Sequence, residues 1–439
     1  MIRIFSIVIP ARAFTLFVSE IVLLFACYMA AAYADPDVAD LSSYLQYDNG
    51  IQRIAIVAVF IFVGFFFRNF YSEVRIRERL ELFQNLCMIF GVAFLGQGLI
   101  SYLDREWILP RKVMLTGSVL SIVVLFGWRL LFDSAARGAT AAKRVLFLGL
   151  SPTTVQLAAQ FKTHPEMGLQ TIGYLETDSA AEGERPMARL GNAKDIDDVL
   201  DKFRPDSIVI GRREDIKPWW VGDFLALHFG GIRVEEASVL YERVFARKCV
   251  TEIWPSRLIF AAALEPPPFG ATLQSFYTPV VAGALLLVTS PAMLAAAILI
   301  RATSRGAILE RSRRMGKNDV PFDLFGFRCH DSAGESTPAG RLLIRCGLRF
   351  LPRLLNVLRG EMAIVGPRPE RPVFVNRLCE EVPFYRQRHA VKPGLTGWAS
   401  VHGSKKDHDS LRELEYDLYY VENLSPMLDS FILLLTLKR

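Results

Sequence analysis

The sequence predicts a membrane protein of three parts: a bundle of apolar helices, an α/β domain, and a mostly helical domain with one further membrane-embedded helix. Three observations support this fold class. Four long apolar runs come first, strand and helix patterns then alternate, and a fifth apolar run opens the C-terminal part. With 439 residues, 51% hydrophobic content and a mean hydropathy of +0.27, the chain is too apolar for one soluble domain.

The first part, residues 1–135, contains the four apolar runs, each about long enough to cross ~30 Å of hydrocarbon as a helix. They are Phe14–Ala34, Ile51–Phe67, Phe83–Leu103 and Val113–Phe132. Basic residues at the N-terminus, in the second loop and after the fourth run predict that these segments are cytoplasmic, although the third loop is basic too. We therefore expect a multi-pass protein with cytoplasmic domains. Glu20 lies inside the first run, and pairing with a neighbouring helix is its favoured role.

The second part, residues 140–262, begins with a short apolar strand, a turn at Gly149 and a helical pattern. A second apolar strand, Ser207–Gly211, follows another helical segment, and this alternation predicts a parallel sheet covered by helices. A dinucleotide-binding turn needs three glycines. Only Gly149 is present, because Ser151 and Thr154 occupy the other two positions. NAD binding is therefore not expected, and a regulatory or assembly role is favoured.

Consecutive prolines in Leu264–Gly270 predict a linker, residues 263–275, because proline can neither continue a helix nor donate to a sheet. The fifth apolar run, Phe276–Ile300, follows and contains Ser290 and Pro291 near its centre. Two topologies are open for this run. It could cross the bilayer, or it could enter, break at Ser290-Pro291 and return to the same face as a re-entrant helix. The second is favoured because it keeps the basic C-terminal domain in the cytoplasm.

The stretch from Leu348 to Gly403 is rich in glycine, proline and basic residues. Two Gly/Pro clusters fix its backbone in turns, and five basic residues are interleaved with them: Arg359, Arg368, Arg371, Arg388 and Lys392. Glycine lets the main chain approach a ligand, and arginine presents a forked donor to phosphate. Two interpretations carry about equal weight: a rigid cationic pocket for a phosphorylated ligand, or loops with a solvated charged face.

Charge and cysteine content narrow the class of partner. The net charge of +6 and the pI near 9.0 suit anionic lipid surfaces and phosphorylated substrates. No motif or basic array favours nucleic acid. The six cysteines and six histidines are dispersed without ligand spacing, so neither a disulfide framework nor a zinc site is expected.

Several motifs between Phe276 and the C-terminus resemble the bacterial sugar transferases, which are polyprenyl-phosphate glycosyl-1-phosphate transferases. The matching segments are Asn356–Leu358, Gly360–Glu370, Lys392–Ala399 and Asp417–Tyr420, with Ser425 and Asp429. The resemblance implies transfer of a sugar-1-phosphate from a UDP-sugar to undecaprenyl phosphate at the bacterial inner membrane, in exopolysaccharide or O-antigen synthesis. It also implies a Rossmann-like middle domain and a mostly helical, membrane-associated catalytic domain, residues 276–439, with a re-entrant helix.

The resemblance also implies which residues hold substrate phosphate. The retained candidates are Arg314, Arg328, Arg368, Glu370 and Lys392, and Arg388 joins them on its charge. At four other positions a polar or basic residue of the family is replaced, which removes a donor or a charge directed to phosphate. These replacements are Gln274, Ser275, Ser312 and Gly326.

The largest departure lies at Arg349 and Phe350. In the family these positions carry an aspartate that attacks phosphorus and a glutamate that holds Mg²⁺, and Arg353 stands where the family has glutamine. A guanidinium stays protonated, and neither substituted side chain offers a carboxylate oxygen to Mg²⁺. The Mg²⁺ that the family uses therefore lacks its ligand here. The acids left as substitutes are Asp323, Glu361 and Glu370.

Two functions remain open on this basis. The chain is either an initiating transferase with altered chemical groups, or a catalytically silent relative. A silent relative would bind undecaprenyl phosphate or UDP-sugar as a partner in a polysaccharide assembly complex, with homo-oligomers also possible in either case. Joint loss of nucleophile and metal ligand costs several orders of magnitude in rate, so we expect little or no UMP release. A membrane sensor with a nucleotide domain would need the missing glycines.

Overall fold

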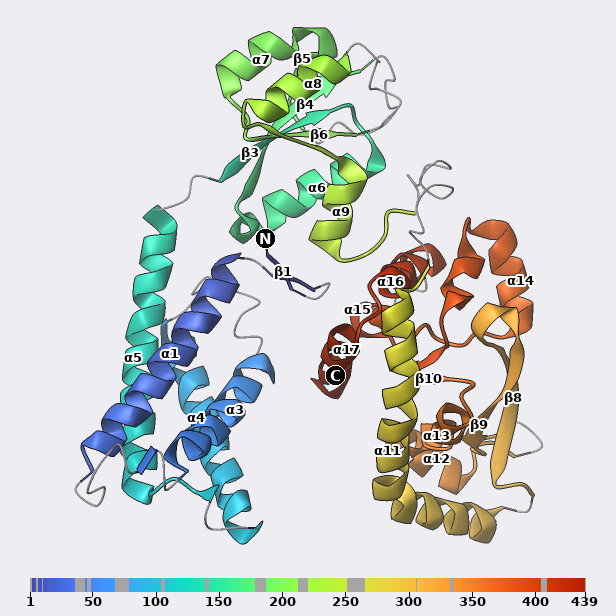
Figure 1. The fold of residues 1–439 in the computed structure, drawn as a ribbon. Helices are drawn as coiled ribbons and strands as arrows, with labels where there is room; N and C mark the ends of the chain where they lie inside the picture. The colour runs from blue at the N-terminus through green and yellow to red at the C-terminus, as the bar shows by residue number, and fades with distance from the viewer. Residues whose placement is uncertain are drawn as a thin grey trace.

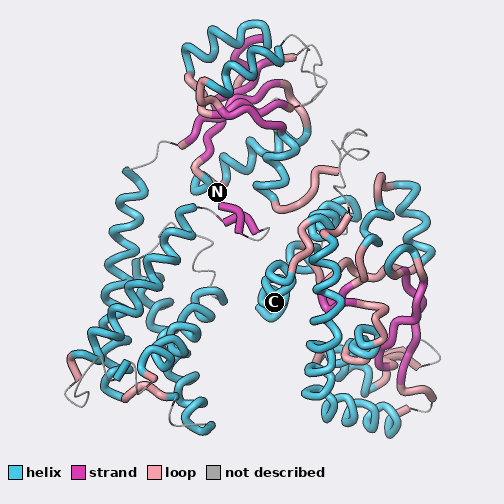
Figure 2. Tube along the Cα trace, in the orientation of Figure 1, coloured by secondary structure: helices cyan, strands magenta, loops and turns pink. Residues whose placement is uncertain are grey.

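The computed structural model shows three parts that follow one another along the chain (Figure 1). It describes residues 2–4, 7–9, 11–35, 44–45, 49–67, 79–103, 107–138, 142–177, 187–211, 220–250, 265–304, 306–331, 335–403 and 409–438. Helices dominate the first and last parts, and a five-stranded sheet forms the centre of the second (Figure 2). The loops on which the predicted membrane orientation rests, 36–43, 68–78 and 104–106, lie outside the described residues.

The N-terminal part is helical wherever the sequence predicts an apolar span. Its described elements are the antiparallel strands β1 (Ile2–Ile4) and β2 (Ile7–Ile9) and the helices α1 (Ala11–Tyr33), α3 (Gly50–Phe67), α4 (Arg79–Leu103) and α5 (Arg111–Gly138). Helices α1, α4 and α5 are long and apolar enough to cross a membrane, as is α11 in the last part, whereas α3 is shorter. By length and composition these helices belong to a membrane protein.

A buried ion pair joins α1 to α5 inside this bundle. Oε1 of Glu20 lies 2.6 Å from Nε of Arg129, and Oε2 accepts a hydrogen bond from Nη2 at 3.1 Å. The same two helices also approach closely at Gly117, where a Cβ would lie 2.5 Å from the Tyr28 ring. A carboxylate in this position requires a cation beside it, because hydrocarbon cannot solvate an isolated charge. The pair supports a structural role for Glu20.

The middle part is a parallel sheet with helices on both faces, as predicted. The strands are β3 (Lys143–Leu148), β4 (Leu169–Glu176), β5 (Arg189–Asn192), β6 (Ser207–Ile210) and β7 (Arg233–Glu236), in the order β5-β4-β3-β6-β7. The helices are α6 (Pro152–Thr163), α7 (Ile196–Phe203), α8 (Trp220–Phe229) and α9 (Ala237–Phe245). Alternate side chains of β3 explain the two layers: Val145 and Phe147 pack with α6 and α9, whereas Leu146 and Leu148 pack with α7 and α8.

The two polar residues at the glycine positions cap helix α6. The Ser151 hydroxyl accepts a hydrogen bond from the Thr154 amide at 3.2 Å, and the Thr154 hydroxyl accepts one from the Ser151 amide at 2.8 Å. This reciprocal capping satisfies amides that a helix N-terminus would otherwise present to a phosphate. The turn is therefore complete without a bound anion.

The C-terminal part begins with the long helix α11 (Pro268–Thr303) and continues with short elements packed against it. They are the antiparallel strands β8 (Leu309–Met315) and β9 (Pro321–Phe327), the parallel strands β10 (Ala363–Val365) and β11 (Gly394–Thr396), and the helices α12 (Pro338–Arg345), α13 (Arg353–Leu358), α14 (Pro372–Glu381), α15 (Trp398–His402), α16 (Ser410–Glu422) and α17 (Pro426–Lys438). Helix α11 starts inside the predicted linker, because proline is compatible with a first helical turn.

Helix α11 turns sharply, so that its C-terminal portion runs across the direction of the first portion (Figure 1). Around the predicted break, Thr289 and Ser290 donate their hydroxyls to the carbonyls of Leu285 and Leu287, and Pro291 has no amide to donate. Such groups bend helices. The earlier half packs in one apolar cluster through Ala282, and the later half packs in another through Ala296 and Ile300. Whether the bend makes the helix re-entrant stays a prediction.

Polar contacts connect the middle part to the C-terminal part. Glu415 of α16 accepts a hydrogen bond from the Tyr241 hydroxyl at 3.2 Å, and its carboxylate lies 3.4 Å from Nε of Arg247. Trp398 donates its indole N–H to the carbonyl of Ala246 at 2.8 Å. The segment that leaves α9 is therefore held against α15 and α16.

Candidate functional site

A cationic pocket lies beside the bend of α11. Its volume is about 440 Å³, and it is lined by Leu285, Thr289, Phe350, Leu351, Arg353, Leu354, Arg368, Pro369, Gly394, Leu395 and Ser400. These residues come from α11, α13, the turn before α13, the loop after β10, β11 and α15. Leucine side chains supply an apolar wall, and two arginines supply positive charge. Thr289 places the predicted Ser290-Pro291 break next to the pocket.

The guanidinium groups of two arginines lie close to the ring of Phe350. The guanidinium carbon of Arg353 lies 4.2 Å from the ring centroid, and that of Arg349 lies 4.9 Å from it. Both distances allow a cation–π interaction. Gly347, in the left-handed region at φ 71°, starts the short turn that carries Arg349 and Phe350. The two substituted positions and Arg353 thus form one stack, defined here as the Arg349–Phe350–Arg353 stack.

Positive charge is concentrated around this stack. Burial lowers the pKa of Arg353 and repulsion from Arg349, Arg314 and Arg368 adds to this effect, so that together they bring it to about 10. Burial also lowers the pKa of Arg314. Arg353 stays protonated at neutral pH, but its Nε is buried and has no hydrogen-bond partner among the described residues. Three further guanidinium groups therefore act on Arg353, which lines the pocket together with Arg368.

Glu370 only partly offsets this charge. Its carboxylate lies 3.9 Å from Nη1 of Arg314 and 3.6 Å from Nε of Arg368, whose side chain is 71% exposed. Ser312, at a position where the family has glutamine, accepts a hydrogen bond from Nε of Arg314 at 3.4 Å. The structure therefore brings together Arg314, Arg349, Phe350, Arg368 and Glu370 from the predicted set.

The remaining predicted phosphate ligands lie elsewhere. Arg388 is buried, with Nη2 2.7 Å from Asp417 and 3.2 Å from the carbonyl of Arg368, so its guanidinium supports the Arg368 loop. Lys392 lines a separate cavity of about 70 Å³, and burial lowers its pKa. Arg328 donates to the Ser304 hydroxyl at the end of α11. The role of Arg388 as a phosphate ligand stays a prediction, and its described contacts are with Asp417 and the Arg368 loop.

The substitute acids are also occupied or remote. The Glu361 carboxylate accepts a hydrogen bond from the Asn356 side chain at 2.6 Å. The same Asn356 amide donates to the Asp323 carbonyl at 2.7 Å and accepts from the Phe325 amide at 3.0 Å, so it fixes α13 against β9. Asp323 itself is an exposed residue of that strand. The motif asparagine thus has a structural role that its sequence alone did not reveal.

The glycines of the two Gly/Pro clusters pack closely against each other. A Cβ on Gly394 would lie 2.1 Å from the Gly366 amide nitrogen, and a Cβ on Gly397 would lie 2.3 Å from the Gly366 carbonyl oxygen. The main chains therefore meet where β10 pairs with β11. The expected close approach exists, but it is between two backbone segments. This contact positions Gly394 and Leu395 at the edge of the pocket.

Gln274 is buried in a hydrogen-bond network instead of facing phosphate. Its side-chain amide donates to the Val365 carbonyl at 3.1 Å and to Tyr420 and Asp429 at 2.8 Å each. The network joins α11 to β10, α16 and α17. The network brings together Tyr420 and Asp429, which both belong to the family motifs near the end of the sequence. Burial raises the pKa of Asp429, opposed by hydrogen bonds from Tyr277, Gln274 and Tyr420.

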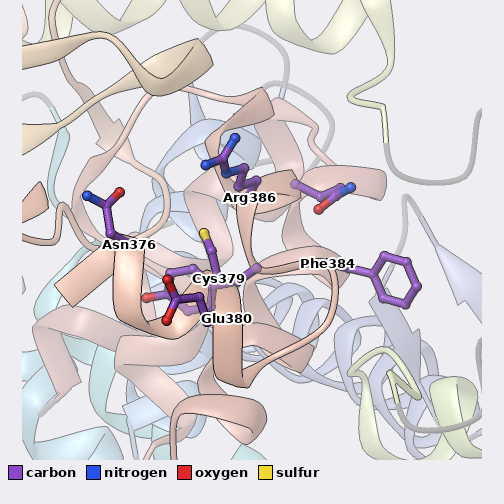
Figure 3. A pocket seen from close by; sticks show the side chains of 7 residues that line it. Asn376, Cys379, Glu380, Phe384 and Arg386 are labelled. Carbon is purple, nitrogen blue, oxygen red and sulfur yellow. The ribbon is translucent and has the colours of Figure 1, made fainter. Parts of the chain in front are cut away.

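A second cavity, of about 540 Å³, lies on α14 and the turn after it. Figure 3 shows its labelled side chains, with the Phe384 ring pointing away from Cys379 and Glu380. The lining residues are Asn376, Cys379, Glu380, Phe384, Tyr385, Arg386 and Gln387. The cavity holds mixed charge and lacks the guanidinium cluster of the first pocket.

The donor set of the cationic pocket does not fit Mg²⁺. Within the described residues, no group of three or more His, Cys, Asp and Glu side chains could hold a metal ion. The positions that carry the family's acids hold a guanidinium and a phenyl ring, and a divalent cation there would face four arginines. A negatively charged group is the better electrostatic match.

Comparison with known proteins agrees with the motifs. Residues 271–439 match the bacterial sugar transferase family. The exopolysaccharide production protein PSS of Rhizobium leguminosarum bv. phaseoli is 37% identical over 169 residues, which cover 34% of this chain and 84% of that protein. The chain belongs to the bacterial sugar transferase family.

Longer relatives match beyond this domain. A UDP-N-acetylgalactosamine-undecaprenyl-phosphate N-acetylgalactosaminephosphotransferase of Aeromonas hydrophila is 31% identical over 255 residues, 54% of this chain and 60% of that protein. A UDP-glucose:undecaprenyl-phosphate glucose-1-phosphate transferase of Xanthomonas campestris pv. campestris is 28% identical over 324 residues, 68% of this chain and 66% of that protein. The chain thus spans somewhat less than two thirds of these two sugar transferases.

Proposed function

We propose that this protein is a catalytically silent bacterial sugar transferase that binds a phosphorylated ligand, undecaprenyl phosphate or a UDP-sugar, at the inner membrane. One observation carries the proposal. The two positions that supply the nucleophile and the metal ligand in the family hold Arg349 and Phe350, and these line or flank a pocket with a cluster of guanidinium groups. In this proposal the pocket still binds phosphate but lacks the nucleophile that would attack phosphorus.

The chemistry of the substituted groups supports this assignment. A nucleophile must present a lone pair to phosphorus, and the protonated guanidinium of Arg349 has none to offer. The apolar wall and the arginines suit a ligand that joins a phosphate to a hydrocarbon or to a nucleoside. A re-entrant α11 would keep this pocket on the cytoplasmic side, where the Rossmann-like middle part could bind an assembly partner or a second copy of the chain.

The decisive experiment measures UMP release. Purified full-length protein in nanodiscs is supplied with undecaprenyl phosphate, Mg²⁺ and, in turn, UDP-glucose and UDP-N-acetylgalactosamine. We expect no UMP above the background of empty nanodiscs. We also expect measurable binding of either undecaprenyl phosphate or a UDP-sugar. Robust UMP release, or absence of binding to either substrate, would contradict the proposal. The variant Arg349→Asp with Phe350→Glu tests whether the family's acids alone restore turnover.

A second candidate function is an active transferase with altered groups. The relatives favour it, because the two longer ones carry the names of undecaprenyl-phosphate sugar transferases. In that case Glu370 is the acid that remains beside the pocket, between Arg314 and Arg368. If the wild-type protein releases UMP and Glu370→Gln abolishes this release, the second candidate is correct.

A further inference from the structure

Two positive charges lie close to a single aromatic ring at the cationic pocket, and one of them, Arg353, lines the cavity together with the ring of Phe350. The guanidinium carbons of Arg349 and Arg353 lie 4.9 Å and 4.2 Å from the centroid of the Phe350 ring. Like charges repel, so two guanidinium groups stay near one another only where something else stabilises them. The quadrupole of the phenyl ring is one such source, and a bound anion would be another.

Arg353 is poised to donate but lacks an acceptor. Its Nε is buried without a hydrogen-bond partner among the described residues, and its side chain lines the cavity. A buried donor left unpaired costs about 1–3 kcal/mol, so a ligand that accepts from it would recover that cost. The carboxylate at hand, Glu370, contacts Arg314 and Arg368.

The chemistry of this arrangement matches a phosphate group. A phosphate carries up to two negative charges and several acceptor oxygens, which a guanidinium fork binds in a bidentate manner. In the family a divalent metal would supply the opposing charge. The donor set here repels such an ion and supplies two positive charges of its own.

We propose that the Arg349–Phe350–Arg353 stack replaces the divalent metal, so that this pocket binds a phosphate group without Mg²⁺. The proposal rests on the proposed function, because it specifies how the silent site holds its ligand. Phe350 keeps the two guanidiniums in place, and Arg353 donates to the phosphate oxygens. The leucine wall, with Leu285 of α11, receives whatever carbon chain the phosphate carries.

The test is a binding measurement on full-length protein in nanodiscs of uncharged lipid. The probes are farnesyl monophosphate, UDP and inorganic phosphate, each titrated in excess EDTA and in excess Mg²⁺. We expect the tightest probe to bind in EDTA at least as well as in Mg²⁺, because free Mg²⁺ competes for its phosphate. A preference for farnesyl monophosphate over inorganic phosphate identifies a lipid headgroup as the ligand, whereas a preference for UDP identifies a nucleotide.

Variants assign the effect to the stack. Arg353→Gln removes the donor and should weaken binding roughly 10- to 100-fold, as expected for a charged hydrogen bond worth about 1.5–3 kcal/mol. Phe350→Leu keeps the apolar volume but loses the ring face, and should weaken binding by roughly two- to fivefold. Arg377→Gln is the matched control, because it removes the same charge from an exposed pair with Glu381 on α14. Arg353→Gln should also reduce the salt dependence of the affinity.

Each failure has its own meaning. Binding that appears only with Mg²⁺ overturns this inference and leaves the silent site of the proposed function standing. Unchanged affinity in a folded Arg353→Gln protein also overturns it. Absence of binding of every probe in both buffers overturns the inference and the proposed function together.

Discussion

Two arginine-rich regions of the C-terminal part differ in how their charge is neutralised. Beneath the Arg368 loop, Arg388 is buried with its guanidinium 2.7 Å from the Asp417 carboxylate. In the pocket, Arg353 is also largely enclosed, but the charged groups that act on it are three further arginines. In the first region a carboxylate neutralises the buried arginine, as it does in the Glu20–Arg129 ion pair of the membrane bundle.

The difference indicates which arginines serve the scaffold and which await a ligand. A buried charge with a carboxylate partner is compatible with a stable fold in the absence of any other molecule. A cluster of like charges raises the free energy of the folded protein, and such costs gather where a protein binds or reacts. Sequence analysis placed Arg368 and Arg388 in one class, and the structure separates them.

The largest effect should come from breaking the matched pair. The Arg388 side chain is only 1% exposed. Asp417→Asn therefore leaves its guanidinium buried beside a neutral group. We expect a loss of about 3–5 kcal/mol in the free energy of unfolding, seen as a lower melting temperature in detergent. The control Glu381→Gln breaks an exposed pair with Arg377 and should cost far less, because solvent screens an exposed ion pair. Equal melting temperatures for the two variants would remove the distinction between the regions.

A smaller effect of opposite sign should follow from relieving the unmatched cluster. Arg353→Gln removes one of four mutually repelling guanidiniums and the burial cost of its charge. We expect the ligand-free protein to gain about 1–2 kcal/mol in stability, although ligand binding is weakened. The measurement is the melting temperature without and with farnesyl monophosphate. A destabilised Arg353→Gln protein would mean that Arg353 supports the scaffold.

The smallest effect concerns Glu415, which joins the middle part to the C-terminal part. Burial raises the pKa of Glu415, opposed by Arg247 and by the hydrogen bond from Tyr241. Because the folded-state pKa lies above the ordinary value of 4.5, the stabilisation linked to its proton is complete below that pH. It is lost as the pH rises through the folded-state value.

Melting temperatures of wild type and Glu415→Gln across this range test the linkage. Relative to the variant, the wild-type protein should lose stability as the pH rises from about 4.5 toward neutrality. His389, whose pKa burial lowers, is present in both proteins and cancels in the comparison. A constant difference between the two curves would contradict the raised pKa of Glu415.

Much of the architecture follows from local pattern. The apolar runs became helices because an unbroken apolar stretch of this length must satisfy its backbone internally in lipid. The alternation of strand and helix patterns produced the parallel sheet, and the pleat sends Val145 and Leu146 to opposite layers. Motif residues such as Asn356 and Gly394 identified the family, although their mutual contacts could not be inferred from their order.

Only part of the site could be predicted from the sequence. The exchange at Arg349 and Phe350 is visible in the chain itself, and so is the loss of carboxylate chemistry. The stacking of Arg353 on Phe350 had no sequence signal beyond its spacing, because a residue three positions away meets the ring only through the turn before α13. The α14 cavity of Figure 3 likewise had no predicted counterpart.

By itself, the sequence determined the membrane helices, the turn at Gly149, the family and the absence of its acidic pair. Only the tertiary structure decided which arginines are neutralised: Arg388 meets an aspartate from a helix well along the chain, whereas Arg353 meets other arginines. The reason is that local patterns depend on neighbours along the backbone. Electrostatic energy depends on distances through space, and these exist only once distant segments have packed together.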